Sequence, residues 1–241
     1  MLLATPTTHH NKTMNTPILP AATVVIARER QEKIEILLLR RNPQLKFAGN
    51  YWVFPGGKTE SSELDFSKGD IDQANKLAAV RECREETGIA ISTEMLRPIS
   101  HWTTPNIHPK RFATQFYICS VSADTSVLID QSEIVEHRWM QAEDSIELHH
   151  AGQLHIMPPT YVTLVEIARH ENYSAIERYY QRRGTRSYKP HPVMHSKTLG
   201  TFLYEGDSGY TDKEPSLKEC LNRCEYNDGI LRHHCNLDDA L

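Results

Sequence analysis

Three glutamates, Glu82, Glu85 and Glu86, lie within five residues of each other near the end of a predicted helix. On a helix these positions share one face, so the three carboxylates repel one another. Glu85 and Glu86 also lie in the last turn, at the negative end of the helix dipole, where a cation is favoured by roughly 0.3–1 kcal/mol. The cluster is therefore either a solvated acidic face paired with nearby arginines or a site that a cation completes.

A Pro-Gly-Gly turn lies upstream and ends in Gly56 and Gly57. Positions without a side chain let a backbone carbonyl approach an ion closely. Hard divalent cations such as Mg²⁺ and Mn²⁺ take carboxylate, carbonyl and phosphate oxygens as ligands. Together, the turn and the glutamates predict a divalent-metal site at which water attacks a phosphoanhydride.

Both stretches resemble the signature of the Nudix hydrolase family, G-x5-E-x7-R-E-U-x-E-E-x-G-U, in which U is an aliphatic residue. Gly57 and Glu63 match its first half. The run Arg-Glu-Cys-Arg-Glu-Glu-Thr-Gly-Ile at positions 81–89 matches its second half, with Cys83 at the first U position. The spacing between the halves departs from the family, because seventeen residues, 64–80, stand where the family has seven.

This resemblance implies a role for each matched residue. Glu82, Glu85 and Glu86 would bind the divalent ions, with the carbonyl oxygen of Gly57 as a further ligand. Arg81 would orient these glutamates through charge-assisted hydrogen bonds. The long spacer puts the supporting role of Glu63 in question, because Glu63 could lie too far from the helix. The base that activates water varies across the family and stays open here among Glu82, Glu85 and four distal carboxylates, which are Glu133, Glu136, Glu143 and Asp144.

Four further segments, WVFPGGK at 52–58 and the stretches 102–118, 136–164 and 203–210, are similar to one branch of the family, the peroxisomal coenzyme A diphosphatases and their bacterial relatives, and the resemblance extends from about residue 21 to 210. That branch also carries extra residues inside its signature. The implied substrate is a small-molecule nucleotide diphosphate, in the first place coenzyme A or an acyl derivative. ADP-ribose, NADH and dinucleoside polyphosphates stay open as alternative substrates, as does a ligand sensor of this fold without turnover.

Four cations are candidates for contacts with the substrate phosphates, although each is also compatible with an ordinary solvated side chain: Arg41, Lys46, Lys110 and Arg111. The segment 101–112 combines aromatic, proline and basic residues between two predicted strands. It is either a wall for an adenine or pantetheine group or an exposed strand edge.

Hydrophobic periodicity predicts a mixture of strands and helices without a repeating β-α-β order, which indicates an α+β class. We expect a Nudix fold, with a mixed β-sheet sandwiched between helices. Residues 72–88 read as the helix that carries the glutamates, and residues 61–72 read as a polar loop. The expected organisation is a disordered tail at 1–17, a Nudix domain at 18–183, and a C-terminal extension at 184–241 that packs on the domain and ends in a hairpin.

Composition excludes some other classes of protein. The net charge of −4 and the pI near 6.3 give no basic field for binding nucleic acid. No apolar run reaches eighteen residues and the start of the chain lacks a secretory signal, so we expect no membrane partner and a reducing cytoplasm. A homodimer is compatible with the sequence. Three of the five cysteines, with His233 and His234 nearby, either bind zinc or form part of the hairpin as free thiols: Cys220, Cys224 and Cys235.

Overall fold

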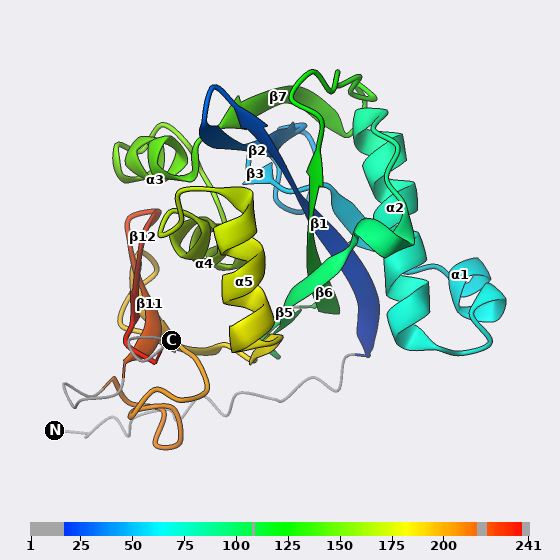
Figure 1. The fold of residues 1–241 in the computed structure, drawn as a ribbon. Coiled ribbons are helices and arrows are strands. Elements are labelled where there is room, and N and C mark those ends of the chain that lie inside the picture. The colour runs from blue at the N-terminus through cyan, green and yellow to red at the C-terminus, as the bar shows by residue number, and fades with distance from the viewer. Residues whose placement is uncertain (1–16, 108, 216–220, 238–241) are drawn as a thin grey trace, which may run out of the picture.

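A mixed β-sheet forms the centre of the molecule (Figure 1). The computed structural model describes residues 17–107, 109–215 and 221–237. The strands follow the order β3-β2-β1-β6-β5-β8, while β4 pairs with β1 and β7 pairs with β2. Pairing is parallel between β1 and β6 and between β5 and β8, and antiparallel elsewhere. These strands are β1 (Ile18–Arg30), β2 (Lys33–Arg41), β3 (Trp52–Val53), β4 (Gly56–Lys58), β5 (Arg97–Thr103), β6 (Arg111–Val121), β7 (Ile134–Met140) and β8 (Arg186–Tyr188).

The central strand β1 is buried on both faces, and its alternate residues enter two different cores. Val24 and Ile26 pack toward the first core, which includes Cys83, and Val25 and Ala27 pack toward the second. This alternation follows from the two-residue period of a strand. The sheet therefore separates the molecule into two halves with different surroundings.

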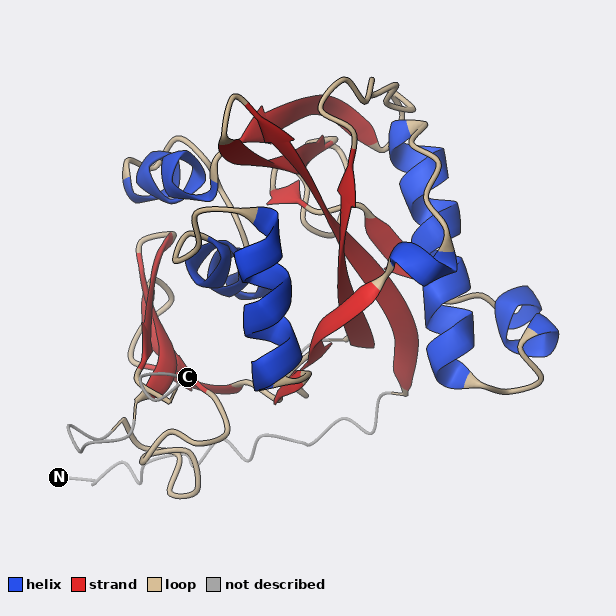
Figure 2. Cartoon of the chain, in the orientation of Figure 1, coloured by secondary structure: helices blue, strands red, loops and turns tan. Residues whose placement is uncertain are grey.

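Helices cover both faces of the sheet (Figures 1 and 2). One face carries α1 (Ser61–Phe66) and α2 (Ile71–Thr87), followed by the short 3₁₀ helix η1 (Thr93–Met95). The other face carries α3 (Ala142–His150), α4 (Pro158–Ile167) and α5 (Tyr173–Arg183). This arrangement confirms the predicted α+β class, with a mixed sheet between helices.

Helix α2 confirms the helix predicted at residues 72–88. Asp70 caps its first turn, since its side chain accepts hydrogen bonds from the backbone N–H groups of Asp72 and Gln73. Gly88 ends it in the left-handed conformation, with φ of 70°. The caps fix where the helix stops, and so they place the three glutamates in its last two turns.

The predicted polar loop at residues 61–72 is wrong in its first half, because residues 61–66 form α1. A capping box starts this helix: Glu60 and Glu63 each bond to the backbone of the other. Six residues are too few to show an apolar helical period, so the sequence pattern read as a loop. The inserted residues therefore form a helical turn of their own before α2 begins.

A second, four-stranded antiparallel sheet lies beyond α4 and is built from the C-terminal part of the chain (Figure 1). Its strands are β9 (His191–Met194), β10 (Leu199–Leu203), β11 (Asn222–Asn227) and β12 (Ile230–Cys235). Strands β11 and β12 form a hairpin whose turn has positive φ at Asp228 (47°) and Gly229 (90°). Of the predicted tail at 1–17, residues 1–16 lie outside the described residues, and the domain boundaries remain predictions. No helix in the described ranges is long and apolar enough to cross a membrane.

Candidate active site

The end of α2 packs directly against the glycine turn. Strand β4 pairs with β1 so that Gly56 faces Thr23 and Gly57 faces Ala22. A Cβ atom on Gly57 would lie only 2.1 Å from Oε1 of Glu82. The backbone N–H of Gly56 donates a hydrogen bond of 2.9 Å to Oε2 of Glu86. The absence of a side chain at Gly57 is therefore what lets the carboxylate of Glu82 reach the turn.

Arg81 connects the carboxylates to one another. Its guanidinium donates to Glu63 at 2.9 Å, to Glu82 at 2.8 Å and to Glu85 at 2.9 Å. A fourth hydrogen bond, of 3.0 Å, reaches the carbonyl oxygen of Lys58 in the glycine turn. Burial works against the charged form, but the bonds to Glu63 and Glu82 outweigh it and raise the pKa of Arg81. The single guanidinium of Arg81 thus orients three glutamates, Glu63, Glu82 and Glu85.

Glu63 stays at this site despite the inserted residues. Its second carboxylate oxygen accepts a 2.7 Å bond from the backbone N–H of Glu60, while the first is bound by Arg81. The inserted residues form the end of α1, the turn after it and the start of α2, so they do not displace Glu63. The sequence-based concern that Glu63 could no longer reach the helix is therefore wrong.

The three glutamates of α2 have different surroundings. Burial raises the pKa of Glu86 to about 8; the Gly56 N–H opposes this rise and the charge of Glu82 adds to it. Burial also raises the pKa of Glu82, against the hydrogen bond from Arg81. The side chain of Glu85 is 58% exposed. Burial therefore disfavours the charged form of Glu86 and of Glu82, the two carboxylates nearest the turn.

The chemistry of these groups fits a divalent cation. Carboxylate oxygens beside a side-chain-free turn are the hard ligands that Mg²⁺ prefers, and a cation would relieve the unfavourable burial of Glu82 and Glu86. Across the described ranges, no three His, Cys, Asp or Glu side chains are already arranged around one point. Two of the glutamates bond to Arg81 and the third bonds to Gly56, so metal binding would require these side chains to turn.

Two other predicted residues lie close to the glutamates. Arg41 and Glu133 form a pair with a distance of 3.8 Å between Nη2 and Oε2. Both act on Glu86, because the positive charge of Arg41 lowers its pKa and the negative charge of Glu133 raises it. The Nε atom of Arg41 is buried and has no hydrogen-bond partner in the described part of the chain. These contacts place a cation and a carboxylate beside the site.

The remaining distal carboxylates are placed elsewhere. Glu136 is paired with Arg40 at 3.2 Å and with Arg138 at 2.7 Å. Glu143 and Asp144 lie in the first turn of α3, on the face of the sheet opposite α2. Geometry therefore favours Glu133 over these three as a distal base.

The other three predicted cations lie beside a different feature, an apolar pocket. Lys46 and Lys110 are exposed in loops, and Arg111 donates a 3.0 Å bond to the carbonyl oxygen of Thr104. Lys46 precedes Phe47 and Arg111 precedes Phe112, and these two aromatic rings lie 6.5 Å apart and line the pocket. Among the described residues, none of these three cations forms a salt bridge with a glutamate of α2.

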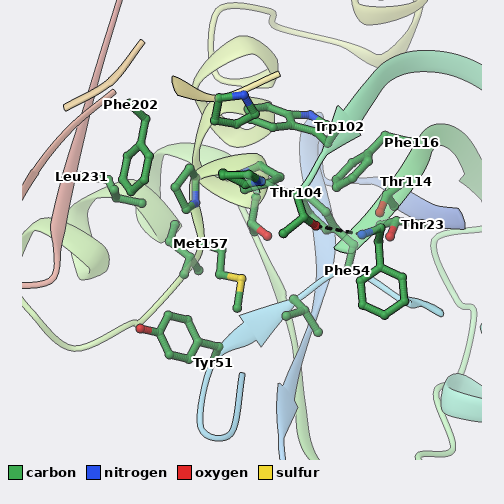
Figure 3. A pocket seen from close by; sticks show the side chains of 18 of the residues that line it. Thr23, Tyr51, Phe54, Trp102, Thr104, Thr114, Phe116, Met157, Phe202 and Leu231 are labelled. Atoms are coloured by element: carbon green, nitrogen blue, oxygen red, sulfur yellow. Dashed lines mark hydrogen bonds between the residues drawn. The ribbon is translucent and has the colours of Figure 1, made fainter. Parts of the chain in front are cut away.

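The pocket has a volume of about 430 Å³ and lies on the face of the sheet that carries α4. Figure 3 shows Trp102 and Phe116 from the main sheet on one side and Phe202 and Leu231 from the C-terminal sheet on the other. None of the described lining residues carries a charge, and no glutamate of α2 is among them. Of this lining, the sequence suggested a binding wall only at the segment 101–112; the aromatic residues of the C-terminal sheet, Phe202 and Tyr226, occur singly, without a motif.

The pocket and the glutamates meet at the glycine turn. Thr23 and Phe54 line the pocket, and they flank Gly56, which pairs with Thr23 and follows Phe54 by two positions. Val53 lines the pocket and also packs against the core on the α2 side. The arrangement suits a ligand with a charged centre at the turn and an apolar group extending to the other face.

Of the two alternatives for the C-terminal cysteines, zinc binding or free thiols in the hairpin, the described residues favour free thiols. Cys220 lies outside them, and Cys224 is fully buried on β11. In the described ranges no cluster of metal-binding side chains forms near Cys224 or Cys235, and the described cysteines form no disulfide.

Comparison with known proteins gives consistent results. The family model described as NUDIX domain matches residues 17–158. The chain is 25% identical to "Putative nudix hydrolase 7" of Caenorhabditis elegans, over 84% of this chain and 78% of that protein. It is 22% identical to "Acyl-coenzyme A diphosphatase NUDT19" of Xenopus laevis, over 54% of this chain and 58% of that protein. Identity to the Homo sapiens protein of the same name is also 22%, over 94% of this chain and 61% of that protein.

A solved structure shares the fold. A NUDIX hydrolase from Alicyclobacillus acidocaldarius superimposes with a TM-score of 0.61 at 24% identity, over 66% of this chain and 95% of that chain. The family match covers more than half of the sequence and includes both the glycine turn and the glutamates of α2. This chain belongs to the Nudix hydrolase family.

Proposed function

We propose that this protein hydrolyses the diphosphate linkage of a nucleoside diphosphate joined to another group, with Mg²⁺ or Mn²⁺ as cofactor. The observation that carries the proposal is the single network in which Arg81 binds Glu63, Glu82 and Glu85 next to the glycine turn. Nudix hydrolases generally use divalent metals, and carboxylates crowded beside such a turn fit that requirement.

Each side chain has a distinct task in this proposal. Glu82, Glu85 and Glu86, with the carbonyl oxygen of Gly57, would hold the cation, which when bound neutralises charge on the phosphoryl oxygens. Arg81 keeps two of these carboxylates oriented, and Glu63 in turn orients Arg81. The fourth hydrogen bond of Arg81, to Lys58, fixes the turn relative to α2.

A carboxylate must also accept a proton from the attacking water. Glu82, Glu85 and Glu133 remain the candidates for this base. Glu133 is the distal candidate because it lies close enough to Glu86 to affect its charge, whereas Glu136 is held by two arginines. Arg41, with a buried Nε that lacks a partner among the described residues, is the best-placed of the four cations to bind a substrate phosphate.

We infer that the substrate is coenzyme A or an acyl derivative. Two of the relatives are named as acyl-coenzyme A diphosphatases, and the uncharged pocket beside the turn can accept an apolar group. Lys46 and Arg111 are each next in sequence to a phenylalanine that lines this pocket, and Lys110 precedes Arg111, so these three cations are candidates to contact a further phosphate of the substrate. ADP-ribose, NADH and dinucleoside polyphosphates are the alternative substrates.

The test incubates the protein with coenzyme A, octanoyl-coenzyme A, ADP-ribose, NADH and a diadenosine polyphosphate, each with Mg²⁺ or Mn²⁺, and identifies the products by mass. The proposal predicts cleavage of the diphosphate linkage in coenzyme A and in its octanoyl ester, and loss of turnover when a chelator removes the metal. Failure to cleave any substrate of the panel would contradict the proposed reaction. Cleavage of ADP-ribose or NADH alone would support the reaction but contradict the substrate.

A further inference from the structure

The C-terminal sheet turns one of its faces toward the pocket. Phe202 on β10 is paired with Cys224 on β11, and Tyr226 on β11 is paired with Leu231 on β12. Because paired residues and alternate residues of a strand share a face, these side chains all point the same way. Phe202, Tyr226 and Leu231 line the pocket. All three lie beyond residue 158, where the match to the family ends.

Two histidines of α3 hold Leu231 in position from both sides of its backbone. The Leu231 N–H donates a 2.8 Å bond to Nε2 of His149, whose Nδ1 bonds to the carbonyl oxygen of Leu154 at 2.9 Å. Since Nε2 must accept, His149 carries its proton on Nδ1. Nε2 of His150 lies 3.2 Å from the carbonyl oxygen of Leu231. These contacts fasten β12 to α3 and fix the direction of the Leu231 side chain.

Aromatic packing fastens the start of the same sheet to the main sheet. Trp102 on β5 stacks on Tyr188 on β8, with ring centroids 4.0 Å apart and planes within 8° of each other. Tyr204, just after β10, contacts both rings edge-on at 5.4 and 5.1 Å. The three rings are buried. The wall formed by the C-terminal sheet is therefore part of the packed structure.

The chemistry of this wall defines what it can accept. Phe202 and Tyr226 form a T-shaped pair with ring centroids 6.5 Å apart, and Leu231 completes an aromatic and aliphatic surface. A phosphate or a sugar placed here would lose its hydration without gaining a charged partner, which is unfavourable. Each methylene group buried here would instead strengthen binding.

We propose that Phe202, Tyr226 and Leu231 are specificity-determining residues, which select a substrate whose group beyond the diphosphate is uncharged and apolar. His149 and His150 act as positioning residues for Leu231. The inference rests on the proposed function for turnover, but the preference for an apolar group can be measured by binding alone. These residues, which lie beyond the family match, thus determine which diphosphate substrates bind next to the glutamates.

The experiment is calorimetric titration in the presence of a chelator, so that binding is measured without turnover. The probes are coenzyme A and octanoyl-coenzyme A, and the proteins are the wild type, Leu231→Ala and Tyr226→Ala. We expect the wild type to bind the octanoyl ester at least tenfold more tightly, with a more negative heat-capacity change, the marker of apolar burial. Each variant should reduce this preference at least fivefold and change binding of coenzyme A less than twofold.

Two further variants separate recognition from folding. Leu231→Met conserves the side-chain volume and should retain the preference within twofold. Leu199→Ala removes an exposed side chain from the opposite face of the same sheet and should behave as the wild type. Thermal unfolding of each variant shows which of them fold, and Tyr226→Ala tests the inference even if Leu231→Ala does not fold.

Equal affinity of the wild type for the two probes, or an unchanged preference in both Leu231→Ala and Tyr226→Ala, would overturn the inference. Hydrolysis of coenzyme A, together with an unchanged preference for the octanoyl ester in both alanine variants, would support the proposed reaction and refute the role of the C-terminal residues in specificity. The expected preference for the octanoyl ester, reduced in the alanine variants but without hydrolysis of any substrate, would refute the reaction and support the role of the C-terminal residues in specificity.

Discussion

On the α2 face of the central sheet, the candidate functional residues are charged, close together in the sequence and joined by hydrogen bonds. On the α4 face they are uncharged, come from segments as distant as Thr23 and Leu231, and are joined by packing. The difference follows from the task proposed for each face. A cation site needs a few carboxylates with fixed directions, whereas a pocket needs only a surface of suitable shape and polarity.

The largest effect on the rate should come from Glu82, whose carboxylate lies against Gly57 in the turn. In Glu82→Gln one charge is removed while the shape is conserved, so we expect a fall in kcat of about 1,000-fold, equivalent to ~4 kcal/mol of barrier. Steady-state rates with octanoyl-coenzyme A and Mg²⁺ measure it. Glu177→Gln, an exposed glutamate of α5, is the matched control and should keep the wild-type rate. A Glu82→Gln enzyme within tenfold of the wild type would show that the α2 face does not carry the chemistry.

Gly57→Ala should have the next largest effect. Its added Cβ would lie 2.1 Å from Oε1 of Glu82, so the carboxylate must move away from the turn. The displaced group is the end of a flexible side chain, and Gly57 does not have a positive φ, so the variant should fold. We expect a loss of about 100-fold in kcat, or ~2.7 kcal/mol, with an unfolding midpoint close to that of the wild type. A rate within threefold of the wild type would contradict the close approach of Glu82 to the turn.

Glu63→Gln should have a smaller effect, because Glu63 acts through Arg81. Removing its charge leaves Arg81 with two carboxylates of α2 and the carbonyl oxygen of Lys58. We expect a decrease in kcat of about tenfold, or ~1.4 kcal/mol, without a change in KM. Glu94→Gln, an exposed glutamate of η1, serves as the control. An unchanged kcat would mean that the contact to Arg81 is structural only.

The smallest expected effect is on the pH dependence of stability, and it arises from His149 on the α4 face of the sheet. Burial lowers the pKa of His149 below its ordinary value of 6.5, and the neighbouring His150 and His155 lower it further, against the Leu154 carbonyl, which raises it. Tyr161 also packs on the ring, 5.1 Å away. Below pH 6.5 the unfolded chain takes up a proton that the folded chain does not, so stability is complete above pH 6.5 and decreases as the pH falls.

Thermal unfolding between pH 5 and 8 measures this dependence. We expect a smaller loss of the unfolding midpoint below pH 6.5 in His149→Gln, whose amide does not titrate, than in the wild type. His195→Gln, which replaces an exposed histidine of the C-terminal extension, is the control and should retain the wild-type profile. Identical profiles in the wild type and His149→Gln would show that this histidine does not link pH to the attachment of β12.

A structural feature could be predicted from the sequence when the residues that determine it lie within one short segment. Helix α2 was predictable because its apolar period and Gly88 lie within one segment, and the glutamates followed from their spacing. Helix α1 was missed because six residues carry no period and its capping box uses Glu60 instead of serine or threonine. The contact of Glu63 with Arg81 depends on how the inserted residues fold, which no local pattern encodes.

The pocket was the least predictable part. Its wall at residues 101–112 was one of two open interpretations, since aromatic residues beside a proline also occur at exposed strand edges. Phe202, Tyr226 and Leu231 are single residues on three different strands, and only the register of the C-terminal sheet brings them to one surface. Contacts that depend on pairing between distant strands leave no spacing in the sequence to recognise.

The division of tasks between the two faces can be tested most directly by one ratio, kcat/KM for octanoyl-coenzyme A divided by kcat/KM for coenzyme A. It is measured with Mg²⁺ in the wild type, Gly57→Ala and Leu231→Ala. We expect Gly57→Ala to lower both values about equally and leave the ratio within twofold of the wild type, and Leu231→Ala to lower the ratio at least fivefold. A ratio that changes as much in Gly57→Ala as in Leu231→Ala, or in neither, would contradict separate sites for chemistry and selection.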